Sequence, residues 1–172
     1  IRGEASRRDA GFVRQFCRSH GIELFVYDAV REGVTIPEHP SEDWARKLRY
    51  GWFDALAQRE EAKIATAHTL SDQAETLLFR LARGTGLHGM AGIPARRGVY
   101  VRPCLCLTGS QTAAYCRALG QDYVQDFTNE TDDYARNRIR HHAIPALESV
   151  NPAAEQAIGR FCRQMQQMDA WL

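Results

Sequence analysis

Short apolar runs alternate along this chain with segments whose apolar residues recur every three or four positions. This alternation limits the possible folds more than any other feature of the sequence. The runs expected to be strands are 23–30, 63–67 and 99–107, and the helices are expected at 7–20, after Ser41, at 71–83, at 110–119 and after Asn151-Pro152. Strands and amphipathic helices in this order are typical of βαβ units. The sequence therefore predicts an α/β fold in which helices flank a parallel sheet.

Three of the expected helices carry a stripe of apolar residues that we expect to face the core. The stripes are Trp44, Leu48, Trp52 and Leu56; Leu77, Leu78 and Leu81; and Ile158, Phe161, Met165, Met168 and Leu172. Gly21 is expected to end the first helix, Ser41 to cap the second, and residues 33–40 and 84–98 to form loops.

Ligands of parallel α/β sheets bind at the carboxyl ends of the strands, so the segments that follow each strand are the ones to inspect. Residues 66–76 leave the second expected strand and enter a helix, with His68 near the strand end. Asp72 and Glu75 lie three residues apart in the first turn and hence on one face. They either stabilise the helix dipole or hold Mg²⁺ together with substrate phosphates, and the residues alone leave both interpretations open.

Two further segments carry candidate chemistry. Residues 83–94 contain four glycines in nine positions, which permits close backbone approach to a ligand but is also common in ordinary loops, and no Walker lysine follows. Residues 134–142 contain Arg136, Arg138 and Arg140, of which Arg136 and Arg140 share a helix face. This face is either a solvated basic surface or a clamp for phosphate or carboxylate.

The charge distribution bears on the partner. The chain has 172 residues and a formal net charge of +1, which on average argues against a polyanionic ligand. However, residues 76–121 contain six arginines and no acidic residue, between two acidic flanks. The average therefore conceals a local basic stretch suited to phosphate or nucleic acid.

The five cysteines form no CxxC pair, and Cys104 and Cys106 would share one face of the third expected strand. We interpret them as reduced cysteines that act as small apolar residues. The sequence shows no secretory signal, lipidation motif or membrane-length apolar run, so it predicts a cytoplasmic location and no membrane partner. It lacks an initiator Met and ends within a helical pattern, so we expect it to be a fragment.

Residues 66–76, 83–87, 136–140 and 151–152 together resemble the tRNA(Ile)-lysidine synthase family, as do residues 1–4 and 45–50. That family belongs to the PP-loop, or N-type ATP pyrophosphatase, superfamily. The resemblance implies a ligase that uses ATP and Mg²⁺ to adenylate the C2 carbonyl of the wobble cytidine in tRNA(Ile). The amine of free L-lysine then displaces AMP and forms lysidine.

The resemblance also implies roles for individual residues. The implied catalytic residues are Asp72, Glu75 and Arg136, with Mg²⁺ on Asp72 and Glu75. The implied substrate or ATP contacts are Arg49, His68, Arg83, Gly84, Gly86, Asn137 and Arg140. Ser71 stands where many members have Asp, which weakens any metal role at that position.

The family's Ser-Gly-Gly-x-Asp-Ser phosphate loop is absent, and we expect it to precede Ile1 together with the first strands. Residues 1–148 are accordingly expected to be part of a catalytic domain, and 149–172 a helix that leads to a following domain. We expect this fragment to be inactive alone.

Two other functions fit less well. Another PP-loop tRNA enzyme, such as one that forms 2-thiocytidine, would typically carry paired CxxC cysteines, which this sequence lacks. A non-catalytic module that binds tRNA through the arginine-rich residues would bind in a salt-dependent way and without ATP.

Overall fold

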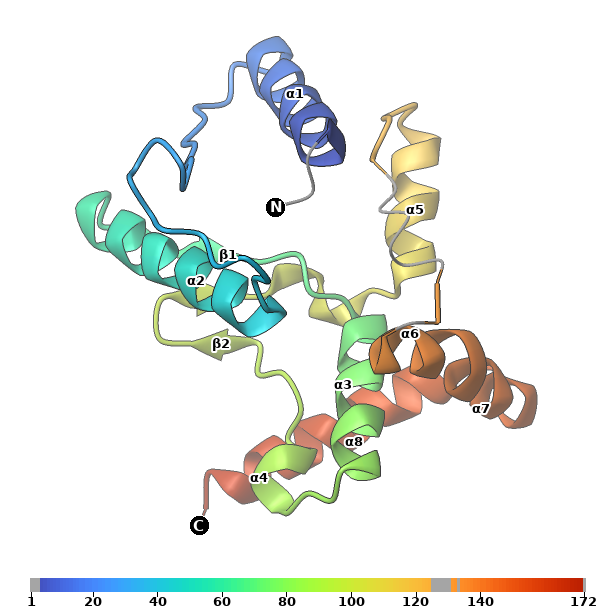
Figure 1. The fold of residues 1–172 in the computed structure, drawn as a ribbon. Coiled ribbons are helices and arrows are strands. Elements are labelled where there is room, and N and C mark those ends of the chain that lie inside the picture. Colours follow the sequence, from blue (N-terminus) through green and yellow to red (C-terminus); the bar gives the residue numbers. More distant parts are fainter. Residues whose placement is uncertain (1–3, 125–130, 133, 172) are drawn as a thin grey trace. The chain divides into compact units, whose positions relative to one another are not determined.

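The computed structural model describes residues 4–124, 131–132 and 134–171 (Figure 1). They form two compact units, Ile1–Ala62 and Lys63–Leu172, within these bounds. No helix of the described residues is long and apolar enough to cross a membrane.

The first unit contains helices α1 (Glu4–Ser19) and α2 (Glu42–Arg59), as the spacing predicts. Gly21 ends the first helix with a φ of 64°, in the left-handed region where glycine is favoured. The N–H of Trp44 donates to Ser41 Oγ over 3.1 Å, which confirms the predicted N-cap of α2. The four predicted core residues of α2 are all half-buried.

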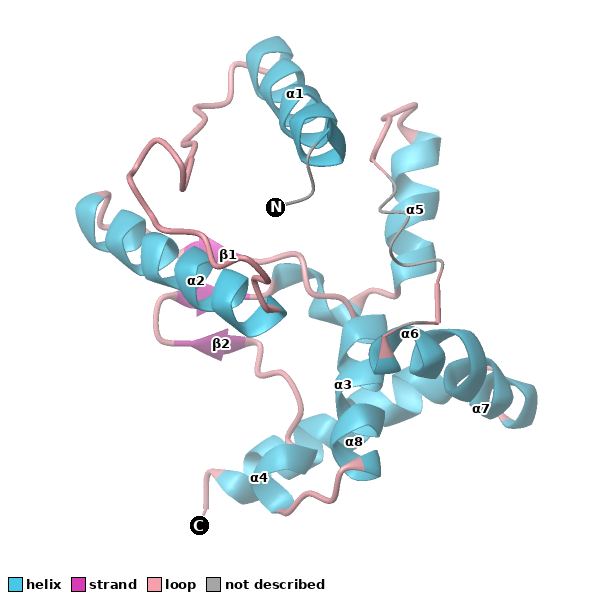
Figure 2. Cartoon of the chain, in the orientation of Figure 1, coloured by secondary structure: helices cyan, strands magenta, loops and turns pink. Residues whose placement is uncertain are grey.

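The strand predicted at 23–30 is wrong. Residues 22–28 form no strand, because a strand requires a hydrogen-bonded neighbour and no described segment pairs with them (Figure 2). Their aromatic residues instead contact α2: the rings of Tyr27 and Trp52 lie 5.7 Å apart, and Arg59 Cζ lies 5.4 Å from the Phe25 ring. The apolar character of this run is therefore used in packing.

The second unit contains a small mixed sheet, in place of the predicted parallel one. Its strands are β1 (Ile64–Ala65), β2 (Arg96–Arg97) and β3 (Tyr100–Val101), in the order β1-β3-β2. β1 and β3 are parallel and β2 and β3 antiparallel. Thus 63–67 is confirmed as a strand, though a shorter one, and part of the predicted glycine-rich loop forms an edge strand.

The strand predicted at 99–107 ends at Val101. Pro103 has no N–H to donate to a ladder, and it begins the 3₁₀ helix η1 (Pro103–Cys106). Cys104 and Cys106 therefore do not share a face of a sheet, contrary to prediction.

The remaining elements of the second unit are helical. They are α3 (Leu70–Ala82), α4 (Leu87–Met90), α5 (Gly109–Ala118), α6 (Ala135–Arg138), the π-helical turn η3 (Ile139–Ala143), α7 (Ile144–Val150) and α8 (Ala154–Asp169). Figure 1 shows α8 crossing behind α3 and α4, and both contact it. This crossing forms the core of the unit.

The predicted core stripes of α3 and α8 are only partly right. Leu77 is buried, but Leu81 is 44% exposed, and on α8 both Phe161 and Met168 are exposed. The buried residues of α8 are Ala154, Glu155, Gly159 and Cys162. At Gly159, α3 comes too close for a larger side chain, because a Cβ there would collide with Leu70. Leu172 lies outside the described residues.

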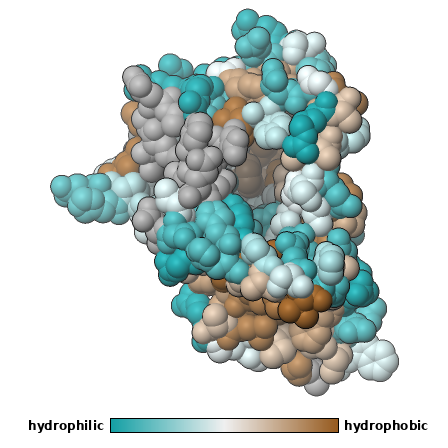
Figure 3. Space-filling view, turned by 90° about the vertical axis from the view of Figure 1, so that its right-hand side faces the viewer, coloured by the Kyte–Doolittle hydropathy of each residue, from teal (hydrophilic) through white to brown (hydrophobic). Residues whose placement is uncertain are grey.

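Apolar surface remains accessible on this unit. Brown hydrophobic atoms are exposed beside hydrophilic ones in the lower part of Figure 3. The large apolar residues that are exposed on α7, on α8 and just after α8 are Leu147, Val150, Phe161, Met168 and Trp171. The described residues of this unit therefore cover the apolar side chains of α7 and α8 only in part.

The environments of the cysteines predict unequal reactivity. Burial raises the pKa of Cys162 to about 11, so at pH 8 only about one such thiol in a thousand is ionised, whereas Cys106 is exposed. We expect iodoacetamide at pH 8 to alkylate Cys106 and to leave Cys162 unmodified in the folded protein. Mass spectrometry of proteolytic peptides measures both sites, and alkylation of both at equal rates would contradict the buried position of Cys162.

Candidate functional site

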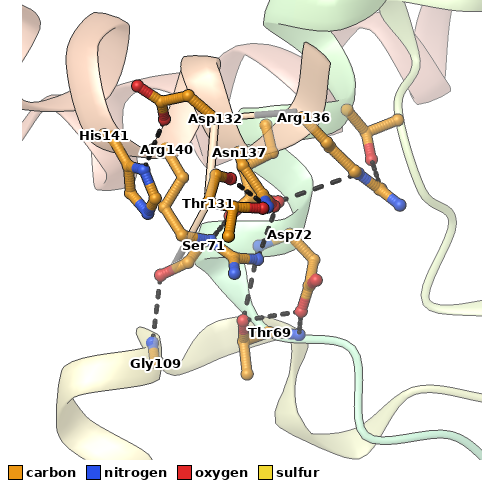
Figure 4. Close-up of polar contacts among 12 residues, drawn as sticks. Thr69, Ser71, Asp72, Gly109, Thr131, Asp132, Arg136, Asn137, Arg140 and His141 are labelled. Atoms are coloured by element: carbon orange, nitrogen blue, oxygen red, sulfur yellow. Dashed lines mark hydrogen bonds and ion pairs between the residues drawn. The ribbon is translucent and has the colours of Figure 1, made fainter. Parts of the chain in front are cut away.

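The first turn of α3 is closed by a reciprocal cap. The N–H and the hydroxyl of Thr69 each donate to Asp72 Oδ2 over 2.8 Å, and the N–H of Asp72 donates to Thr69 Oγ1 over 3.3 Å (Figure 4). The capping interpretation of Asp72 is thereby confirmed. Its role in catalysis stays a prediction.

Glu75 has a different environment, although it lies only one turn away. Its side chain is 3% exposed, and both of its carboxylate oxygens accept from Arg140: Nε donates to Oε1 over 2.7 Å and Nη2 to Oε2 over 3.1 Å. Arg136 Nε lies 3.7 Å from the same Oε2, and Arg136 Nη2 donates to Thr76 Oγ1 over 2.7 Å. Two segments about 60 residues apart in the sequence thus meet at one buried carboxylate.

Electrostatics favour the charged form of Arg140. The hydrogen bonds to Glu75 raise the pKa of Arg140 above its ordinary value, and the nearby charges of Glu75 and Asp72 act in the same direction. The prediction that Arg136 and Arg140 share a face is confirmed, because both guanidinium groups reach Glu75.

Mg²⁺ does not fit Glu75 in this arrangement. Magnesium needs carboxylate oxygens that are free to coordinate, whereas both oxygens of Glu75 accept from one guanidinium and a second guanidinium lies beside them. The described residues also contain no group of three or more His, Cys, Asp or Glu side chains placed to hold a metal ion. Glu75 therefore binds arginine here, and we assign it no metal.

Polar contacts fix the surroundings of this cluster. Asn137 is buried and donates from Nδ2 to the Thr131 carbonyl over 2.7 Å. The N–H of Gly109 donates to Ser71 Oγ over 3.0 Å, which joins the starts of α5 and α3. His68, after the end of β1, has Nδ1 2.9 Å from Thr66 Oγ1. We call Asp72, Glu75, Arg136 and Arg140 the α3 cluster.

Arg83, Gly84 and Gly86 lie at the opposite end of α3. Eleven residues separate Asp72 from Arg83, which is about 16 Å along a helix axis. Gly84 ends α3 with a φ of 76°, and Gly86 precedes α4 as its N-cap. The structure therefore does not bring these three residues to the α3 cluster.

Two residues that the sequence analysis did not single out hold the glycine-rich segment in place. Arg80 Nη1 donates to the carbonyls of Gly89 and Gly92 over 2.9 and 3.0 Å. The side chain of Gln73 bonds both the N–H and the carbonyl of Ile93. Gln73 and Arg80 are seven residues apart and therefore lie on one face of α3. The sequence signal that could have found them is a pair of polar residues on the helix face expected to be buried.

Residues 1–147 match the family described as the PP-loop domain. The chain belongs to the PP-loop family. It is 41% identical to the tRNA(Ile)-lysidine synthase of Bacteroides thetaiotaomicron over 92% of its length and 40% identical to that of Parabacteroides distasonis over 96%. It spans 38% of the length of each of these relatives.

A solved structure supports the fold. The U34-tRNA thiolase of Methanococcus maripaludis, solved with its [4Fe-4S] cluster, superposes on 92% of this PP-loop chain and 56% of its own, with a TM-score of 0.71. The sequence identity is 16%, so the similarity concerns the fold alone.

Arg49 belongs to the first unit of this PP-loop chain. It is exposed on α2 and lines a cavity of about 450 Å³ together with Leu48, Trp52 and Phe53. The α3 cluster lies in the second unit, so the role of Arg49 stays a prediction.

An acid–histidine cluster adjoins the arginine segment. Asp132 Oδ1 lies 2.8 Å from His141 Nδ1, and Oδ2 lies 2.6 Å from His142 Nε2. These hydrogen bonds, that of His142 first, lower the pKa of Asp132 below its usual value of 3.8. The adjacent histidines were visible in the sequence, but nothing in it indicated their shared partner.

Proposed function

We propose that this chain is part of a tRNA(Ile)-lysidine synthase, which uses ATP, tRNA(Ile) and free L-lysine. The observation that carries the proposal is the α3 cluster. It unites residues 72–75 with residues 136–140, two of the segments in which the chain resembles that family, around one buried carboxylate. The identity to curated synthases over at least 92% of the chain supports the same function.

The proposed reaction has two steps. The C2 carbonyl oxygen of the cytidine attacks the α-phosphorus of ATP, and pyrophosphate leaves. The lysine amine, after losing a proton, then attacks C2, and AMP leaves with the C–O bond electrons.

The α3 cluster offers groups for both steps. Arg136 remains 45% exposed while it is anchored to Thr76 and Glu75, so its guanidinium is oriented yet accessible to phosphoryl charge that develops in the first step. Asp72 is half-buried, and we assign it the proton of the lysine ammonium. Glu75 acts as a positioning residue through Arg136 and Arg140.

Lysidine formation is preferred over thiolation despite the thiolase fold neighbour. The chain has no CxxC pair, and in the described residues its cysteines form no group that could hold a metal ion. Cys104, Cys106 and Cys116 therefore offer no basis for a cluster like the one in that structure.

The reaction is tested by incorporation of labelled lysine. We expect the protein that contains this chain to transfer lysine to the wobble cytidine of tRNA(Ile) only when ATP is present. Asp72→Asn should lower kcat about 100-fold or more, as for loss of a general base. Asp43→Asn is the matched control, since Asp43 lies in the first turn of α2. Transfer of sulfur, or equal rates in both variants, would contradict the proposal.

A further inference from the structure

The second unit contains a groove that the α3 cluster does not use. It has a volume of about 500 Å³ and lies between the last turns of α3 and the α6–η3 segment. Its apolar lining is Phe79, Ala82, Ala135, Ile139 and Ala143, and its basic lining is Arg83, Arg138 and His142. No acidic side chain of the described residues lines it.

One wall of the groove is planar and cationic. Arg83 Cζ lies 5.2 Å from the centre of the Phe79 ring, and Arg83 forms no ion pair with any described residue. Aromatic rings and guanidinium planes are the surfaces on which proteins stack unpaired bases of RNA. The wall thus offers one nucleobase a stacking surface.

The other wall carries donors for phosphate. Arg138 is exposed, and its Nη1 donates to the Asp132 carbonyl over 2.9 Å, which fixes its position and leaves its charge unneutralised by that contact. His142 Nε2 lies 2.6 Å from Asp132 Oδ2, so this part of the lining faces a carboxylate. Arg83 and Arg138 therefore give the groove its positive character.

We propose that this groove binds one unpaired nucleotide of the RNA substrate, with its base against Phe79 and Arg83 and a flanking phosphate at Arg138. The choice of RNA as the occupant rests on the proposed function. The apolar lining and the two arginines of the groove complement a base joined to a phosphate. Arg83 lies about 16 Å along α3 from Asp72. Arg83 thereby gains a role in RNA binding rather than in contacts to the reacting ATP.

Binding of fluorescent tRNA(Ile) and of a short single-stranded RNA, measured by anisotropy at several salt concentrations, tests the proposal. Phe79→Leu should weaken binding about 5-fold or more without changing the salt dependence, because it removes a stacking surface and no charge. Arg138→Gln should weaken binding and reduce the salt slope by about one, because it removes the phosphate contact. Arg83→Gln should weaken binding with a smaller change in slope, because it removes a stacking contact to the base. The matched control is Arg160→Gln, an exposed arginine of α8 in the same unit that lies outside the basic stretch 76–121.

Affinities of all three variants equal to that of the control would overturn the proposal. So would a loss of ATP affinity with RNA affinity unchanged, which would make the groove an ATP site. Ultraviolet cross-linking of the unmodified protein to RNA needs no variant: we expect adducts on the peptide that contains Phe79, and adducts elsewhere only would refute the assignment. Neither assay requires lysine. Failure of lysine transfer alone would therefore refute the proposed reaction but not the proposal that the groove binds RNA.

Discussion

Replacing Arg140 with methionine should lower the free energy of unfolding by about 2–3 kcal/mol. The variant leaves the carboxylate of Glu75 buried, with only Arg136 at 3.7 Å to offset its charge. Removing one partner of a fully buried pair costs about 3–5 kcal/mol, and we take a lower value because Arg140 is 39% exposed. Urea denaturation measures the loss directly.

Two further variants give this prediction its controls. Arg138→Met removes an exposed arginine that donates to a carbonyl, so it should cost less than about 1 kcal/mol. The double variant Glu75→Met/Arg140→Met should recover most of the loss, because paired apolar residues avoid an unpaired buried charge. A single Arg140→Met variant as stable as the parent would show that the ion pair is not made in solution.

Replacing Gly92 with alanine should cost about 2–5 kcal/mol. Gly92 has a φ of 64°, which costs a residue with a Cβ about 1–2 kcal/mol. The new Cβ would also lie 2.6 Å from Gln73 Oε1 and 3.0 Å from Cys162 Sγ, in a well-packed region where overpacking costs about 1–3 kcal/mol. Gln73 is buried and bonds Ile93, so it has little freedom to move away.

Gly120→Ala separates the two contributions. Gly120 has a φ of 62°, but no described atom lies within 4 Å of the position that a Cβ would take there, so only the backbone cost of about 1–2 kcal/mol applies. Equal losses in the two variants, measured by thermal or urea unfolding, would mean that the close approach of Gln73 to Gly92 is relieved at no cost.

Local sequence signals predicted five of the helices, which are present as α1, α2, α3, α5 and α8, but they did not predict α4, α6, η3 or α7. Ser41 and Gly21 mark helix ends by mechanisms that act within a few residues, and the four-residue spacing of Arg136 and Arg140 placed both on one face. Strand lengths were predicted poorly because they depend on partners: residues 22–28 have none among the described segments, and Pro103 ends the ladder.

The prediction of the buried helix face was wrong where α8 meets α3. The apolar period of α8 favoured Phe161 and Met168, yet the contact with α3 uses the small residues Gly159 and Cys162. The spacing of apolar residues identifies the most hydrophobic face of a helix, whereas two helices that cross closely need small residues at the point of contact.

The candidate site was predicted in its parts but not in its arrangement. Asp72 and Glu75 were expected to act as a pair, yet one caps a helix and the other receives an arginine from a distant segment. No local rule connects residues that are 65 positions apart. The distance of Arg83 from Asp72, by contrast, already follows from the helix expected at 71–83, which α3 confirms.

The pairing of Glu75 with Arg140 sets an order of events during synthesis. A ribosome that adds about 5–20 residues per second needs about 3–13 s after Glu75 to add the 65 residues that reach Arg140. During that interval the carboxylate of Glu75 on the nascent α3 has no cationic partner, so burial of that face would cost the desolvation of an unpaired charge. We therefore expect the second unit to complete its packing around Glu75 only after Arg140 has been synthesised.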